Sequence, residues 1–267
     1  MRRVKEKNCI FLLTRGYSFR DFKNYKILIQ RNRRIGKFLR SSQAKASGWV
    51  DFRILIFHEG NINFLQQVII SILSLLPIRF KSISKDFKLH PNNIWLSTSE
   101  MPLSYSLMCQ FNYYHVWKYL ETYDVVCRID EDVWMESFPS LRRDFSLITG
   151  ALYPETHELT NQSLYQFLTE LEMESFYNHR FPFTNFYVTK SSLWKNPTVQ
   201  NLLFKFYSHR LSADHRWGDL PILGVTFNST VDQKTGITCD SSISYRHLSH
   251  HGIVQDGNQT NYKRDLT

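Results

Sequence analysis

One stretch, residues 123–134, constrains the fold more than any other, because an apolar run ends there in a cluster of acids. The apolar members of the run are Val125, Val126, Cys127 and Ile129. Such a nearly continuous run is typical of a strand that is buried on both faces of a sheet. Three acids follow it, Asp130, Glu131 and Asp132. Ligands of open α/β sheets bind at the carboxyl ends of strands, so the stretch predicts a central strand with a functional end.

The spacing of these acids indicates a metal site. Asp130 and Asp132 are two residues apart, so an extended backbone directs both side chains the same way. Two carboxylates on one side bind a hard divalent cation, which neutralises the charge of a phosphorylated substrate. The pattern is that of an Asp-x-Asp site in a nucleotide-sugar transferase. The alternative is a solvated strand end at which acids simply cluster, and the motif alone does not exclude it.

Predicted strands and helices alternate before the central strand. Strands are expected at 9–13, 51–57 and 90–96, and helices at 25–40, 64–72 and 104–121. This order builds a mostly parallel sheet flanked by helices. Residues 41–48 are predicted to be a connection of small residues.

After the acids the pattern is less regular. We expect strands at 146–153 and 186–188, a helix capped by Asn161, a helix at 199–206, and a helix near Pro221 that Asp219 caps. With no repeat or linker, we predict one domain at 9–254 and flexible ends at 1–8 and 255–267.

The net charge of +9 fits a phosphate-rich partner: a nucleotide, a nucleic acid or an anionic membrane surface. The basic cluster at 31–40 is interleaved with apolar residues, which favours a solvated helix face. A nucleic-acid-binding arm is the alternative, although no recognisable nucleic-acid module accompanies it. The apolar segments at 9–13 and 68–78 are too short to span a bilayer. We therefore expect a cytoplasmic protein, with peripheral membrane contact left open.

Five stretches line up in order with one family. They are 105–111, 123–132, 184–186, 216–221 and 244–247. Together they resemble the glycolipid 2-alpha-mannosyltransferase family of fungi, most specifically through Arg-Ile-Asp-Glu-Asp at 128–132 and Arg-Trp-Gly-Asp-Leu-Pro at 216–221. The resemblance implies a single-domain GT-A fold and a metal-dependent retaining glycosyltransferase. It also implies GDP-mannose as donor, manganese as cofactor, and a glycan, glycolipid or glycoprotein as acceptor.

The same resemblance implies roles for individual residues. The metal would be held by Asp130, Asp132 and His247, and the donor by Arg15, Tyr105, Arg128 and Trp217. Four of them have an alternative: solvent exposure for Arg15, core packing for Tyr105, an exposed histidine cluster for His247, and a carboxylate partner rather than the diphosphate for Arg128.

Two residues are candidates for catalysis. Asp219 is expected to accept the proton of the acceptor hydroxyl. Tyr187 stands where the family has a glutamate that is a candidate nucleophile, directly after Asn185 and Phe186. This departure puts a covalent glycosyl-enzyme in doubt and favours front-face attack, in which a diphosphate oxygen takes the proton. It also keeps open a pseudoenzyme that binds a nucleotide sugar without transferring it.

Overall fold

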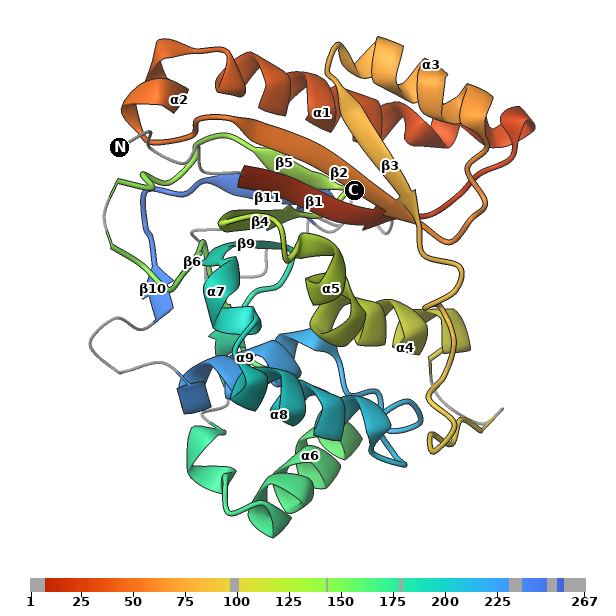
Figure 1. Cartoon of the computed structure of the whole chain (residues 1–267), viewed down its shortest axis with the longest axis vertical. Coiled ribbons are helices and arrows are strands. Elements are labelled where there is room, and N and C mark those ends of the chain that lie inside the picture. The colour runs from red at the N-terminus through yellow and green to blue at the C-terminus, as the bar shows by residue number, and fades with distance from the viewer. Residues whose placement is uncertain are drawn as a thin grey trace.

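The computed structural model describes residues 8–96, 101–142, 144–177, 180–230, 237–248 and 254–256, with only the backbone described at 237, 247–248 and 254–256. This part of the chain forms three layers, a seven-stranded sheet between two groups of helices (Figure 1). The strand order is β10-β6-β9-β4-β1-β2-β3. In chain order these strands are β1 (Asn8–Thr14), β2 (Phe52–His58), β3 (Ile78–Ser82), β4 (Val125–Ile129), β6 (Leu147–Thr149), β9 (Phe186–Lys190) and β10 (Ile237–Cys239).

Two smaller sheets complete the strands. One has the order β12 (Val254–Asp256), β11 (Tyr245–Leu248) and β5 (Val133–Met135), and the other pairs β7 (Leu152–Tyr153) with β8 (Phe181–Pro182). Strand β5 follows β4 after a short turn, so the three-stranded sheet lies next to the end of the central strand.

The helices cover both faces of the large sheet (Figure 1). One face carries η1 (Phe19–Tyr25), α1 (Lys26–Leu39), α2 (Ser42–Ala46) and α3 (Phe64–Ser74). The other carries α4 (Leu103–Gln110), η2 (Phe111–His115), α5 (Val116–Leu120), α6 (Glu158–Glu170), η3 (Glu174–Phe176), α7 (Ser191–Trp194), α8 (Pro197–Ser208) and α9 (Asp219–Thr230). No helix in the described ranges is both long and apolar enough to cross a lipid bilayer.

Strand β4 lies at the centre of the sheet, parallel to β1 and antiparallel to β9. Its residues alternate between two hydrophobic cores: Val126 packs into the core under α5 and α8, whereas Cys127 and Ile129 pack into the core under α1. Burial on both faces explains the nearly continuous apolar run. The predicted fold class, a mixed and mostly parallel sheet flanked by helices, is confirmed.

Several predicted elements were wrong. The strand expected at 90–96 is a turn region held by side-chain bonds, with Asn93 Nδ2 donating to the carbonyl of His209 at 2.8 Å, and the third strand is β3. The expected connection at 41–48 contains α2, where the Ser41 hydroxyl accepts a bond from the Ala44 N–H. Helix α6 begins at Glu158, so Asn161 lies inside it and does not cap it. The flexible ends predicted at 1–8 and 255–267 fall almost entirely outside the described residues.

The basic residues of α1 form a solvated face only in part. Arg31 is 1% exposed, and the half-buried Arg34 donates to the Met135 carbonyl on β5. The exposed Arg33 and Arg40 donate to the carbonyls of Leu73 and Leu75 at 2.5 and 3.3 Å. These arginines therefore attach α1 to its neighbours, which weakens the nucleic-acid alternative.

Candidate functional site

The three acids after β4 form a turn at the edge where parallel strands end. The Val133 N–H donates to the Asp130 carbonyl at 3.2 Å, so the backbone is not extended there. The prediction that Asp130 and Asp132 point the same way assumed an extended backbone, and that assumption was wrong. The Thr14 hydroxyl at the end of β1 donates to the Glu131 carboxylate, which ties the turn to the neighbouring strand. The charge of Asp132 still reaches Asp130, whose pKa is raised by burial first and by that charge as a smaller contribution.

A buried arginine joins two carboxylates at this turn. Arg128, on β4 and 5% exposed, donates Nε to Asp130 Oδ1 at 2.7 Å and Nη2 to Oδ2 at 3.2 Å, and its Nη1 to Asp219 Oδ2. Burial lowers the pKa of Arg128, but the two carboxylates outweigh burial and hold it well above its ordinary value. The alternative expected for Arg128, carboxylate partners in place of a diphosphate, is thus present.

Asp219 reaches this cluster from the opposite half of the chain. It is the first residue of α9, which begins two residues earlier than predicted, and the residue is 7% exposed. The chain turns sharply before it, with Arg216 at a φ of 55°. The Arg128–Asp219 ion pair joins the two most specific motifs across 91 positions. Asp219 therefore faces Arg128, and this contact rather than a helix cap is its observed role.

Two tyrosines border the cluster. Tyr187 lies directly opposite Arg128 on β9 and is 1% exposed. Its hydroxyl has no hydrogen-bond partner among the described residues, and burial raises its pKa. Tyr105, on α4, is half-buried, and the guanidinium carbon of Arg216 lies 5.5 Å from its ring centre. The structure thus gathers Asp130, Arg128, Asp219, Tyr187 and Tyr105 around the end of β4.

The other predicted residues lie elsewhere. Arg15 is exposed just after β1, and its charge acts on Glu59, whose pKa burial raises and Arg15 lowers. Donor binding by Arg15 stays a prediction. Trp217 is 1% exposed and packs in the core, parallel to the His209 ring at 4.5 Å, with its indole N–H bonded to Ser163 at 2.9 Å. The proposed contact between Trp217 and the donor is therefore not supported.

The residues at the turn fit a divalent cation held in part by the substrate. No group of three or more metal-ligating side chains is present among the described residues. Asp130 and Asp132 carry carboxylate oxygens, the ligand type that a hard cation takes, and a cation bound by one or two carboxylates plus substrate phosphates needs no larger set. The side chain of His247 lies outside the described residues, but its backbone on β11 pairs with Val133, one residue past Asp132. This position is compatible with the predicted third ligand, which stays a prediction.

Sequence reasoning missed a second buried arginine. Arg31 Nε donates to the Asp130 carbonyl at 3.0 Å, and Nη2 donates to the Ile129 carbonyl. A signal was available, because Arg31 lies three residues after Leu28 and four before Ile35, on the apolar stripe of the helix. The basic residues that follow it, Arg33 and Arg34, made it look like part of a solvated basic cluster.

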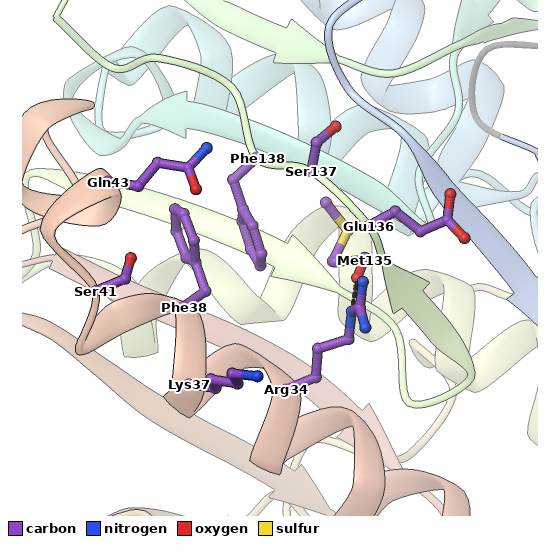
Figure 2. Close-up of a pocket in the computed structure, with 9 residues that line it drawn as sticks. All are labelled: Arg34, Lys37, Phe38, Ser41, Gln43, Met135, Glu136, Ser137 and Phe138. Carbon is purple, nitrogen blue, oxygen red and sulfur yellow. Dashed lines mark hydrogen bonds between the residues drawn. The ribbon is translucent and has the colours of Figure 1, made fainter.

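A separate cavity of about 270 Å³ lies between α1, α2 and the segment after β5 (Figure 2). The rings of Phe38 and Phe138 stack on each other with their centres 3.8 Å apart, and Arg34 points to the Met135 carbonyl. None of the residues predicted for the site lines this cavity.

Comparisons with known proteins agree with the fold. No protein-family model and no curated protein matches the sequence. The structure is similar to core-mannan synthase A from Aspergillus fumigatus in its Mn/GDP form, with a TM-score of 0.70 and 11% identity over 97% of this chain and 78% of that one. It is also similar to the mannosyltransferase Ktr4p from S. cerevisiae, solved alone and with GDP, with a TM-score of 0.68 and 14% identity over 98% and 76%. At these identities the likeness concerns architecture: this chain has the GT-A-type fold of glycosyltransferases.

Proposed function

We propose that the chain is a metal-dependent glycosyltransferase that moves a sugar from a nucleotide donor to a hydroxyl of a glycan or related acceptor. One observation carries the proposal: in a GT-A-type fold, Asp130, Arg128 and Asp219 meet at the carboxyl end of the central strand. This is where ligands of α/β sheets bind. Mannose, GDP and retention of configuration are the finer part of the proposal, supported by the sequence resemblance and by the structural neighbours.

The side chains at the turn have distinct roles in this proposal. Asp130 and Asp132 would hold the cation, with His247 as the third ligand, and a bound cation supplies charge neutralisation for the diphosphate. Arg128 fixes the Asp130 carboxylate with two hydrogen bonds and keeps the Asp219 carboxylate in place by a third. Arg15, at the end of β1, is free to contact the donor from the solvent side.

Transfer is proposed to proceed without a covalent intermediate at position 187. A tyrosine stands there, and burial keeps its hydroxyl protonated by raising its pKa. The acceptor oxygen would bond to the anomeric carbon on the side from which the diphosphate departs. The bond from that carbon to the diphosphate breaks, and the acceptor proton passes to a diphosphate oxygen. Asp219 would orient the acceptor hydroxyl through a hydrogen bond.

The test is titration calorimetry of GDP and UDP with and without Mn²⁺, followed by a transfer assay with GDP-mannose. We expect Mn²⁺-dependent GDP binding that Asp130→Ala removes, and transfer that Asp132→Asn nearly abolishes while the fold survives. Asp144→Asn is the matched control, because Asp144 is an exposed carboxylate paired with Lys190 on the surface. Tighter binding of UDP than of GDP would mean that the donor is a UDP-sugar rather than GDP-mannose. Lack of binding to either nucleotide would contradict the proposal.

The second candidate is a pseudoenzyme, which the buried Tyr187 at the family's glutamate position favours. It predicts the same Mn²⁺-dependent nucleotide binding with no transfer to any acceptor and no slow hydrolysis of the donor. Donor hydrolysis by the wild-type chain that Asp132→Asn removes would exclude it.

A further inference from the structure

The backbone of Asp130 is held from the face of the sheet opposite to Arg128. Arg31 projects from α1, and its guanidinium ends against the last residue of β4 and the first residue of the acidic turn. Its Nη1 donates to Asn32 Oδ1 at 2.7 Å, and Asn32 Nδ2 in turn donates to the Ser74 hydroxyl at 3.2 Å on α3. All three residues are buried, at 1%, 0% and 0% exposure.

These contacts fix the direction of one side chain. The Ile129 carbonyl belongs to the peptide unit before the Asp130 Cα, and the Asp130 carbonyl belongs to the unit after it. A rigid guanidinium that bonds both carbonyls therefore restrains both peptide planes, and with them the direction in which the Asp130 side chain leaves the backbone. Arg128 holds the carboxylate itself. The turn adds the Val133 N–H as a second donor to the same Asp130 carbonyl.

Burying the Arg31 cation among uncharged oxygens is energetically unfavourable, so packing alone does not explain an arginine at this position. Its hydrogen-bond partners are carbonyl and amide oxygens, and burial lowers the pKa of Arg31 to about 10 even though Asp130 opposes the shift. A buried cation also repels a metal ion electrostatically. If charge were its main effect, Arg31 would weaken a metal site at the turn. If geometry is its main effect, Arg31 strengthens that site.

We infer that Arg31 is a positioning residue, which holds the turn so that the Asp130 carboxylate is aimed at the divalent cation before the cation binds. This inference rests on the proposed function. Residues that do not bind a metal themselves but orient its ligands are common at metal sites. Their loss typically weakens metal affinity about 10–100-fold.

The test compares Mn²⁺ affinity, measured by calorimetry in saturating GDP, for Arg31→Lys, Arg31→Met and the matched control Arg33→Lys. Arg33 lies two residues further along the same helix and is exposed. Lysine keeps the charge but offers one ammonium group that cannot span the same acceptors. We expect Arg31→Lys to weaken Mn²⁺ binding about 10-fold or more, and Arg33→Lys to bind as the wild type does.

A second readout needs no metal. Hydrogen exchange of the Val133 amide reports the turn, and the Leu13 amide on β1 reports the intact sheet. Arg31→Lys is expected to speed exchange at Val133 while Leu13 stays protected. If the Arg31 variants unfold, Asn32→Ala replaces them, because it removes one acceptor of Arg31 and leaves the guanidinium in place.

Two results would overturn the inference while leaving the proposed function intact: wild-type Mn²⁺ affinity in Arg31→Lys, or tighter binding in Arg31→Met, which would show that charge dominates. Failure of the wild-type chain to bind Mn²⁺ with either nucleotide would instead remove the proposed function, and the inference with it.

Discussion

Two buried arginines meet at Asp130 from opposite faces of the sheet, and their hydrogen-bond partners differ in charge. Arg128, on the α9 side, bonds to the carboxylates of Asp130 and Asp219, whereas Arg31, on the α1 side, bonds to backbone carbonyls and an amide oxygen. The pKa of Arg128 is accordingly raised and that of Arg31 is lowered to about 10, because dipoles offset burial less than charges do. On the Arg128 side the contacts join charged groups, whereas on the Arg31 side they restrain the backbone.

The largest effect is expected on the Arg128 side. Arg128→Met leaves Asp130 and Asp219 without their cation, and removing one partner of a buried ion pair costs about 3–5 kcal/mol. Urea denaturation followed by circular dichroism measures the free energy of unfolding. Adding Asp219→Asn should recover part of the loss, because one of the uncompensated charges is removed. A loss below about 1 kcal/mol would mean that the carboxylates are solvated, and the contrast with Arg31 would disappear.

A smaller effect is expected on the Arg31 side. Asn32→Ala removes an acceptor of Arg31 and the bond to Ser74, and unsatisfied buried groups cost about 1–3 kcal/mol. The same urea measurement reports the loss. Ser74→Ala is the matched control, since it removes the second bond and leaves the contact with Arg31 in place. If the two variants lose the same stability, the contact between Asn32 and Arg31 contributes little, and the two sides differ less than their partners suggest.

The parts of the fold that sequence reasoning found are those with a long periodic signal. Strands β1, β2 and β4 and helices α1, α3 and α8 each carry an apolar pattern that one buried face or two buried faces impose. Strand β3 was missed because it is a short edge strand whose side chains are mostly exposed. Strands β5 and β11 are three and four residues long, and their existence depends on pairing with each other.

The candidate site shows the same division. The Asp-x-Asp spacing indicated Asp130, and the family resemblance indicated Arg128 and Asp219, but no local pattern shows that residues 91 positions apart form an ion pair. That contact depends on how α9 packs on the sheet. Trp217 lies in the 216–221 stretch and yet packs in the core, so a place in a motif does not by itself indicate contact with a ligand. Arg31 lay on an apolar stripe, and only tertiary structure shows what it bonds.

The smallest effect on stability is expected at Tyr187, beside Arg128. Tyr187→Phe removes a buried hydroxyl that has no hydrogen-bond partner in the described part of the chain, so the free energy of unfolding should change by less than about 0.5 kcal/mol or rise slightly. Transfer is the informative measurement, because stability alone does not report whether this buried, unpaired hydroxyl beside Arg128 takes part in the reaction. A fall in turnover at unchanged stability would place Tyr187 in contact with donor or acceptor. Unchanged turnover would assign Tyr187 to core packing. Arg128 and its two carboxylate partners would then be the groups that distinguish their face of the sheet from the Arg31 face.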